Sequence, residues 1–262
     1  MRTLIGTSGF GIGRVKYFQL FSCVEVQHTF YQPPAIKTLA RWREAAPPDF
    51  EFVLKAWQLI THDAKSPTYR RLKKKLSETE KQEAGYFRPT GVVEEAWEIT
   101  LACANALQAT TILFQCPASF KQTGENLANL RKFFANIKRH QVDENGRKKS
   151  RVFNLCWEPR GEWDPKVVKS ICDELKLWHV VDPFVNQSVT PDRLYYRLHG
   201  RSGWRYEYDE PELRELASML ATDTKKKKAR GGNAAYIFFN NVSMIQDAAR
   251  FQLIVEGKVH PD

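Results

Sequence analysis

Eight short apolar runs spread over the whole chain constrain the fold more than any other feature of the sequence. They lie at residues 3–8, 23–30, from 52 onward, 110–116, 151–158, 177–182, 194–199 and 236–240. Helical patterns separate most of them, and strands that alternate with helices pair in parallel through right-handed crossovers. Eight such units in 262 residues predict an α/β fold of the TIM type, a closed (β/α)8 barrel that forms one domain over residues 1–262. A doubly wound open sheet is the alternative.

The same pattern predicts the helices and the long connections. Helices are expected at residues 34–44, 92–107, 126–140, 164–175, 210–220 and 243–255. A polar stretch at about 63–90 follows the third strand and holds the basic cluster Arg70–Lys75. Connections of this length are usually functional lids or disordered, so we predict a long basic lid insertion after strand three. The lysine run Lys225–Lys228 precedes the eighth strand. We expect it in a solvated loop at the amino ends of the strands, the face of the barrel opposite to the one that usually carries the active site.

Composition limits the partners and the compartment. Lys and Arg total 40 against 30 Asp and Glu, and this formal net charge of +10 favours an anionic ligand such as nucleic acid or a sugar phosphate. A basic surface without a specific partner explains the charge equally well. No apolar run approaches the roughly 20 residues of a membrane span, and the chain starts directly with a strand pattern. We therefore expect a cytoplasmic protein with no signal peptide and no membrane partner.

The five cysteines are odd in number and widely spaced along the chain. Neither a Cys-x-x-Cys pair nor a Cys/His cluster is present, so the pattern indicates neither a disulfide framework nor a zinc site. Three of the five lie in predicted strands, which is typical of small buried side chains in a reducing compartment.

Lys55 interrupts the third apolar run, and a lysine is almost never buried unless it is paired or used in function. A desolvated lysine can have a lowered pKa and act as a base or as a Schiff-base nucleophile. It can equally be a fixed positive charge that holds an anionic substrate. The sequence leaves both roles open.

Polar side chains stand at or just beyond the carboxyl ends of several predicted strands, where barrels of this type place their chemistry. We expect Lys55, Glu158 and His199 to be catalytic, with Glu158 as the general acid or base and His199 as its partner. The residues expected to bind substrate or phosphate are Thr29, Tyr31, His62, Gln115, Arg160, Asp182, Arg197 and Asn240.

Glu25 is a separate case on the second predicted strand, where it shares a face with Gln27 and Thr29. We expect it early in that strand and deep in the barrel. An ion pair with Lys55 or Arg197 would satisfy its charge, and we prefer this structural role to a catalytic one.

Two basic segments, Arg70–Lys75 and Gly200–Tyr208, follow predicted strands on the side of the expected site. Arginines interleaved with aromatic side chains suit phosphate groups and stacked bases or sugars. Ordinary packing of long side chains on a surface is the alternative explanation.

Neither a metal nor a cofactor is expected. A hydrolytic metal site in a barrel needs several His, Asp or Glu ligands at strand ends. Only Glu158, Asp182, His199 and His62 qualify, which is a thin set of donors. The glycines from Gly9 to Gly13 do not have the spacing of a dinucleotide-binding loop and favour a tight turn instead.

Six stretches in a fixed order span nearly the whole chain: Gly6–Phe10, Val24–Tyr31, Phe52–His62, Leu113–Pro117, Tyr196–Gly200 and Phe238–Asn241. Together they resemble the YecE-like family, a DUF72-type domain of unknown function. The resemblance implies a TIM-type barrel and no settled activity. The family is likened to sugar isomerases and to barrel-type DNA-repair endonucleases at the level of the fold only.

Three hypotheses about function remain open, and whether the protein is an enzyme is undecided. The first is a metal-independent enzyme that acts on a phosphate-bearing sugar unit, preferably within nucleic acid. The second is an isomerase or lyase for a small sugar or sugar phosphate, which needs a closed pocket. The third is a non-catalytic protein that binds nucleic acid or a metabolite. The oligomeric state is not predicted.

Overall fold

The computed structural model describes residues 2–139, 152–225 and 234–258. Within these ranges the chain divides into two compact units. Unit 1 comprises residues 1–25, 46–51 and 178–262, and unit 2 comprises residues 26–45 and 52–177. All but the first residue of the lysine run Lys225–Lys228 lie outside the described residues, and so does the last residue of the helix expected at 126–140. The prediction of one domain over residues 1–262 stays a prediction.

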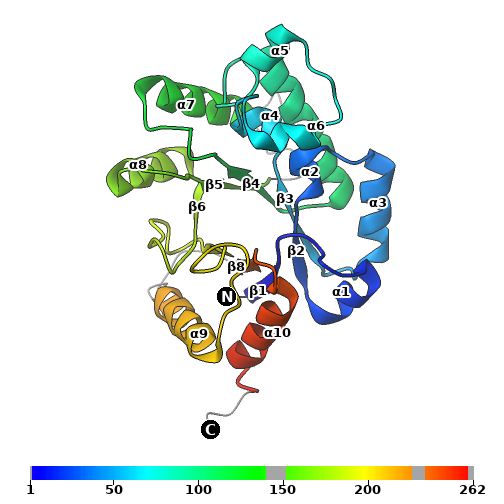
Figure 1. The fold of residues 1–262 in the computed structure, drawn as a ribbon, viewed down its shortest axis with the longest axis vertical. Coiled ribbons are helices and arrows are strands. Elements are labelled where there is room, and N and C mark those ends of the chain that lie inside the picture. The colour runs from blue at the N-terminus through cyan, green and yellow to red at the C-terminus, as the bar shows by residue number, and fades with distance from the viewer. Residues whose placement is uncertain (1, 140–151, 226–233, 259–262) are drawn as a thin grey trace. The chain divides into compact units, whose positions relative to one another are not determined.

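Unit 1 is built on four strands that pair in parallel in the order β1-β8-β7-β6. These are β1 (Arg2–Thr7), β6 (Trp178–Val181), β7 (Tyr195–Leu198) and β8 (Ala234–Phe239). The described helices of this unit are α1 (Arg14–Leu20), α9 (Glu210–Lys225) and α10 (Met244–Val255). α10 packs against β1, β8 and α9 (Figure 1). β8 is apolar and buried from Ala235 onward, as expected for a parallel strand that helices cover.

Unit 2 contains three strands that pair in parallel in the order β5-β4-β3. These are β3 (Glu51–Lys55), β4 (Thr111–Gln115) and β5 (Asn154–Glu158). The helical elements are α2 (His28–Tyr31), α3 (Ile36–Ala45), α4 (Gln58–Thr61), the 3-10 helix η1 (Pro67–Arg71), α5 (Glu78–Glu83), α6 (Gly91–Leu107), α7 (Gly124–Arg139) and α8 (Pro165–Leu175). α6 packs against α3, α4 and α5 (Figure 1). The remaining strand, β2 (Cys23–Val26), is where the chain passes from unit 1 into unit 2.

The register of the unit 2 sheet aligns three polar side chains. Gln115 stands opposite Glu158, and Lys55 stands opposite Leu113, two residues before Gln115. Side chains two residues apart on a strand share a face. The carboxyl ends of β3, β4 and β5 therefore present Lys55, Gln115 and Glu158 on adjacent strands.

Local signals set several helix ends where the sequence predicts them. The Asp164 side chain accepts a hydrogen bond of 2.8 Å from the Lys166 amide, and Pro165 takes the first helical position of α8. This is the expected start of a helix. α6 ends at Leu107 because Gln108 turns into the left-handed region, with φ of 53°.

The predicted second strand is wrong beyond Val26. β2 ends there, Gln27 already has helical backbone angles, and α2 follows. Thr29 therefore lies on a helix and does not share a strand face with Glu25, which is the third of the four β2 residues rather than an early one. The β-branched and aromatic residues favour a strand, but the Thr29 hydroxyl lies 3.1 Å from the Val26 carbonyl, a local contact that favours the turn.

All five cysteines are free and buried, in agreement with the predicted absence of a disulfide framework. Within the described ranges, no helix combines the length and the apolar character that crossing a bilayer requires.

Candidate functional site

The Lys55 ammonium lies between an amide and an aromatic ring, all within unit 2. Its Nζ donates a hydrogen bond of 2.6 Å to Gln115 Oε1 and lies 3.8 Å from the centroid of the Phe30 ring. Lys55 is only 5% exposed. A carbonyl oxygen and the face of a ring both stabilise positive charge. Two groups that suit positive charge thus contact the buried ammonium.

Thr29 fixes the end of the strand that holds Lys55. Its side chain is buried, and its Oγ1 donates to the Lys55 carbonyl at 2.7 Å. α2 is thereby tied to the last residue of β3. The described contacts of the Thr29 hydroxyl are to the backbone, and a role in substrate binding stays a prediction.

Glu158 is a buried carboxylate beside a partly exposed arginine. Glu158 is 4% exposed, and its Oε1 accepts from Arg160 Nε at 2.9 Å and from Arg160 Nη2 at 2.8 Å. The Arg160 side chain is 37% exposed, so it reaches from the buried acid towards solvent. A partly exposed guanidinium is a group that can bind an anion from solvent.

His62 lies next to these charges but is itself uncharged near neutral pH. Burial is the largest cause that lowers its pKa to about 3, and the positive charges of Lys55 and Arg160 act in the same direction. Its ring meets the Phe30 ring edge-on at 4.8 Å, and its Nδ1 lies 2.8 Å from Thr61 Oγ1. A substrate would therefore meet a neutral hydrogen-bonding group at His62 rather than a cation.

The expected lid at 63–90 is packed at its beginning. The Tyr69 hydroxyl donates to the His62 carbonyl at 2.8 Å, and the Arg71 guanidinium lies 3.8 Å from the Tyr31 ring centroid. Arg71 thus covers a ring that the sequence assigned to substrate binding. The segment is ordered here, while its roles as an insertion and as a lid stay predictions.

The end of the same segment returns to His62. The Gly85 amide donates to the Leu59 carbonyl at 2.7 Å, with φ of 82°. A Cβ at Gly85 would come within 2.2 Å of the His62 carbonyl oxygen. Only glycine fits such an approach. Within the basic cluster, Lys74 is paired with Glu95 at 2.9 Å, so part of its charge is already balanced.

Unit 1 contains a second polar cluster, centred on Glu25 and Arg197. Arg197 Nε and Nη2 bind the two Glu25 carboxylate oxygens, each at 2.9 Å. Tyr195 donates to Oε2 at 2.5 Å and Ser8 donates to Oε1 at 2.9 Å. Glu25 thus pairs with Arg197, one of the two partners expected from the sequence, and the pair uses two N–H groups of a side chain that the sequence assigned to phosphate.

His199 extends this cluster through its ring. Its Nε2 lies 3.2 Å from Arg197 Nη1, and a guanidinium can only donate. Nε2 must therefore accept, which places the proton of a neutral ring on Nδ1, 3.7 Å from Asp182 Oδ2. The same Asp182 oxygen accepts from the His199 amide at 2.9 Å. Glu25, Arg197, His199 and Asp182 form one continuous polar chain.

Asn240 stands at the end of β8, where its amide donates to the Leu198 carbonyl. No functional role was predicted for its neighbours Asn241 and Asp247. Asn241 Nδ2 donates to the Tyr206 carbonyl at 2.7 Å and to Asp247 Oδ2 at 2.6 Å, and Asp247 is completely buried. Asp247 also binds Arg250 at 2.7 Å. The spacing of Asp247 and Arg250 in the first turns of α10 was the signal available in the sequence.

The predicted site residues therefore form two groups. Unit 2 contains Lys55, Gln115, Glu158, Arg160, His62, Thr29 and Tyr31. Unit 1 contains Asp182, Arg197, His199 and Asn240. Among the residues that the structure describes, no three His, Cys, Asp or Glu side chains gather as metal ligands. The unit 2 group offers a buried cation, a buried carboxylate and a guanidinium that reaches solvent.

The family model for DUF72, described as a protein of unknown function, matches residues 15–260. The chain belongs to the DUF72 family. The resemblance found in the sequence is confirmed, and the match covers both units of this DUF72 protein. A comparison with curated proteins gave no match.

Solved DUF72 structures are similar along nearly the whole chain. The family protein from Enterococcus faecalis has a TM-score of 0.69 and 19% identity, covering 99% of this chain and 97% of that one. The family protein from Thermotoga maritima has a TM-score of 0.69 and 21% identity, covering 98% and 100%. These likenesses show the fold, an α/β TIM-type barrel of eight parallel strands, and confirm the predicted class.

The DUF72 protein is also similar to a sugar epimerase. The D-psicose 3-epimerase of Clostridium cellulolyticum, solved with D-tagatose, has a TM-score of 0.54 and 9% identity, and the match covers 98% of this chain and 99% of that one. An identity this low shows a shared fold and nothing about the reaction.

Proposed function

We propose that this DUF72 protein is a metal-independent enzyme that acts on a phosphate-bearing sugar unit, with Lys55 and Glu158 beside the reacting atoms. The supporting observation is that a buried cation and a buried carboxylate end two strands that flank β4, with Gln115 between them. Burial of either charge costs free energy, and functional sites are where such costs are commonly met. The carboxyl ends of parallel strands are also where barrel enzymes carry out their chemistry.

The contacts of each residue suggest its role. Gln115 and Phe30 favour the ammonium form of Lys55, so Lys55 stabilises negative charge that develops on a substrate oxygen. Glu158 moves the proton, and the partly exposed Arg160 binds the phosphate. The likeness in fold to an epimerase solved with a ketose supports a sugar as the substrate class, by analogy of fold alone.

The proposal also specifies the molecule that contains the sugar phosphate, either nucleic acid or a free metabolite. The formal net charge of +10 supports a polyanion, so nucleic acid is preferred to a free metabolite. Thermal unfolding with ribose 5-phosphate, ribose, or an oligonucleotide with an abasic site compares these sources at low salt. We expect the oligonucleotide to raise the Tm most and ribose least. If neither phosphate-bearing ligand raises the Tm, the proposal is wrong.

Matched variants identify the site. Lys55→Met and Arg160→Met should abolish the shift in Tm, and Lys37→Met, a change of an exposed lysine on α3, should keep it. Arg160 is partly exposed, so its variant remains informative if Lys55→Met does not fold. Equal shifts in wild type and both site variants would place the binding elsewhere.

Catalysis is tested separately from binding. Deuterium from solvent should enter the sugar if Glu158 transfers a proton at carbon, and Glu158→Gln should stop the exchange. Borohydride treatment should trap no adduct on Lys55, because Gln115 Oε1 already holds its Nζ in a hydrogen bond; a Lys55-dependent adduct would assign it the nucleophile's role. Binding without exchange or product formation would support the non-catalytic alternative.

A further inference from the structure

The segment from Lys65 to Lys75 in unit 2 concentrates positive charge to which the proposed function gives no role. No acidic residue occurs between Asp63 and Glu78. The basic residues of the segment are Lys65, Arg70, Arg71, Lys73, Lys74 and Lys75. Lys74 pairs with Glu95, whereas the other five are exposed and have no ion pair with any residue that the structure describes. A surface of this kind attracts a polyanion.

The backbone of this segment is fixed, although most of its basic side chains reach solvent. The amides of Lys73 and Lys74 both donate to Gln32 Oε1, at 3.0 and 3.3 Å. At the start of the segment, the Tyr69 hydroxyl donates to the His62 carbonyl at 2.8 Å. Binding is weakened when a loop must first become ordered. A backbone that is already held in place avoids this cost.

Exposure alternates along the second half of the segment. Arg71, Lys73 and Lys75 are exposed, and the residues that follow each of them, Leu72, Lys74 and Leu76, are half-buried. The three exposed cations therefore follow one another along the chain on its solvent side. Cations in series suit a ligand with phosphates in series, such as one strand of nucleic acid, better than a metabolite with a single phosphate.

Two aromatic rings connect the segment to the candidate site. The Arg71 guanidinium lies 3.8 Å from the centroid of the Tyr31 ring, and that ring lies 4.9 Å from the Phe30 ring. Phe30 in turn contacts the Lys55 ammonium, with 3.8 Å between Nζ and the ring centroid. A nucleic acid carries a phosphate at every sugar, so a strand with one sugar at Lys55 has its next phosphates on the side of Arg71.

We propose that this segment binds the phosphates of a single nucleic acid strand beside the sugar on which Lys55 and Glu158 act. The inference rests on the proposed function and specifies its substrate as a polymer. Arg160 holds the phosphate of the reacting unit, while Arg70, Lys73 and Lys75 hold the phosphates of its neighbours. Contacts to phosphates carry no sequence information, so the segment binds strands of any base sequence.

The dependence of binding on salt tests these contacts. The ligand is a short fluorescent single strand with one abasic site, and fluorescence anisotropy gives its Kd. The triple change Arg70→Gln, Lys73→Gln and Lys75→Gln should weaken binding by about tenfold or more at low salt. It should also lower the slope of log Kd against log salt by about 2, because each phosphate contact on a single strand contributes about 0.7. The shift in Tm with ribose 5-phosphate should stay as in wild type, since its one phosphate binds Arg160.

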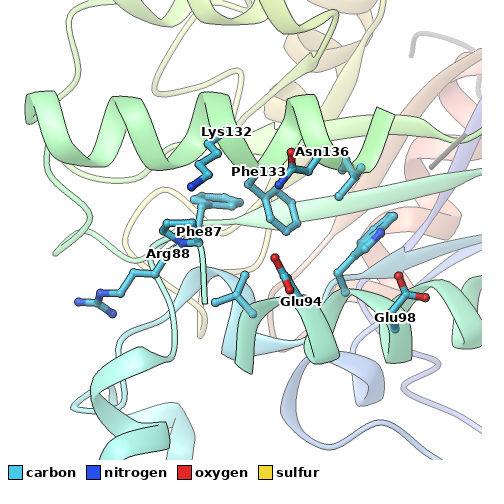
Figure 2. A pocket seen from close by; sticks show the side chains of 11 residues that line it. Phe87, Arg88, Glu94, Glu98, Lys132, Phe133 and Asn136 are labelled. Atoms are coloured by element: carbon cyan, nitrogen blue, oxygen red, sulfur yellow. The ribbon is translucent and has the colours of Figure 1, made fainter. Parts of the chain in front are cut away.

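A cleft between α6 and α7 of the same unit provides a position for the matched control. Its lining combines Arg88 and Lys132 with Glu94 and Glu98, so its formal charges balance (Figure 2). Lys132→Gln, together with Lys37→Gln and Lys176→Gln, removes as many charges as the first triple change, all from exposed positions outside the segment. This control should keep the wild-type slope and lose less than about twofold in affinity.

Two results would overturn the proposal: wild-type affinity and slope in the segment variant, or equal losses in the two triple variants. Polyglutamate tests an acidic peptide as the ligand. If it binds wild type as tightly as the oligonucleotide does, the segment does not select nucleic acid and the proposal is wrong. Lys55→Met and Arg160→Met change the response to ribose 5-phosphate and report on the proposed function, so the failures of the two proposals are distinguishable.

Discussion

Arg197 binds both carboxylate oxygens of Glu25, and the two side chains are 1% and 0% exposed. Two charges removed this far from water lose most of their hydration. Their mutual attraction offsets the loss only when the remaining lone pairs are also satisfied. Tyr195 and Ser8 supply these hydrogen bonds, so the pair is a complete unit rather than an isolated contact.

Arg197→Met should lower the free energy of unfolding by about 3–5 kcal/mol, because it leaves the Glu25 carboxylate buried without its counter-charge. Urea unfolding measures this directly. Arg214→Met removes an exposed pair with Glu210 and should change the stability by less than about 1 kcal/mol. A double variant, Arg197→Met with Glu25→Leu, should recover part of the loss. If Arg197→Met and Arg214→Met lower the free energy of unfolding equally, burial of the Glu25–Arg197 pair does not determine its contribution to stability.

His62 should make the folded protein less stable in acid. Burial lowers its pKa to about 3 from an ordinary value of 6.5. Between these values the unfolded chain binds the proton and the folded chain does not, so stability falls as the pH falls from 6.5 towards 3. At pH 5 the loss relative to pH 7 is about 2 kcal/mol.

His62→Gln should remove this contribution and flatten the dependence of the urea midpoint on pH between 5 and 7. His28→Gln, a change of an exposed histidine, is the matched control and should leave the slope as in wild type. An imidazole signal that titrates near pH 6.5 in the NMR spectrum of wild type, and that His62→Gln abolishes, would contradict the burial argument.

Thr29→Val keeps the shape of the side chain and removes the hydroxyl that donates to the Lys55 carbonyl. We expect a loss of about 1–2 kcal/mol in unfolding free energy, because a buried acceptor loses its partner. Thr222→Val, on the exposed side of α9, should be within about 0.5 kcal/mol of wild type. Chemical denaturation of the two variants under the same conditions gives the comparison.

Gly85→Ala should destabilise the protein by more than about 2 kcal/mol. The left-handed backbone disfavours a side chain, and the new Cβ would meet the His62 carbonyl oxygen. Gly91→Ala is the control: at the start of α6 nothing lies within 4 Å of the added Cβ, and the change should be neutral or slightly stabilising. Thermal unfolding of the two variants measures this difference in stability. Equal Tm values would mean that the turn at Gly85 relaxes easily.

The sequence predicts the fold well where local chemistry determines an element. The helix expected at residues 92–107 is Gly91–Leu107, and the cap at Asp164 begins α8 as predicted. The prediction of the second strand is wrong beyond Val26 because two local signals disagree. Residues 27–31 have side chains typical of strands, but the Thr29 hydroxyl near the Val26 carbonyl favours a helical turn.

The candidate site was predictable in part. Parallel strands in register bring their carboxyl ends together, so Lys55, Gln115 and Glu158 could be grouped from the strand pattern alone. The Phe30 ring beside the ammonium could not be foreseen once its segment was taken for a strand. The choice of Arg197 as the partner of Glu25 depends on strand order across 172 residues, and residue spacing carries no such information.

The five buried thiols are built-in probes for the rate at which each part of the protein opens. Alkylating reagents attack the thiolate, and burial raises the pKa of Cys103 to about 11, so each cysteine reacts only after its surroundings open. Cys23 belongs to unit 1 and Cys156 to unit 2. Mass spectrometry of a labelling time course therefore gives two opening rates from the unmodified protein. Equal rates identify one cooperative transition, and unequal rates rank the two units by their resistance to opening.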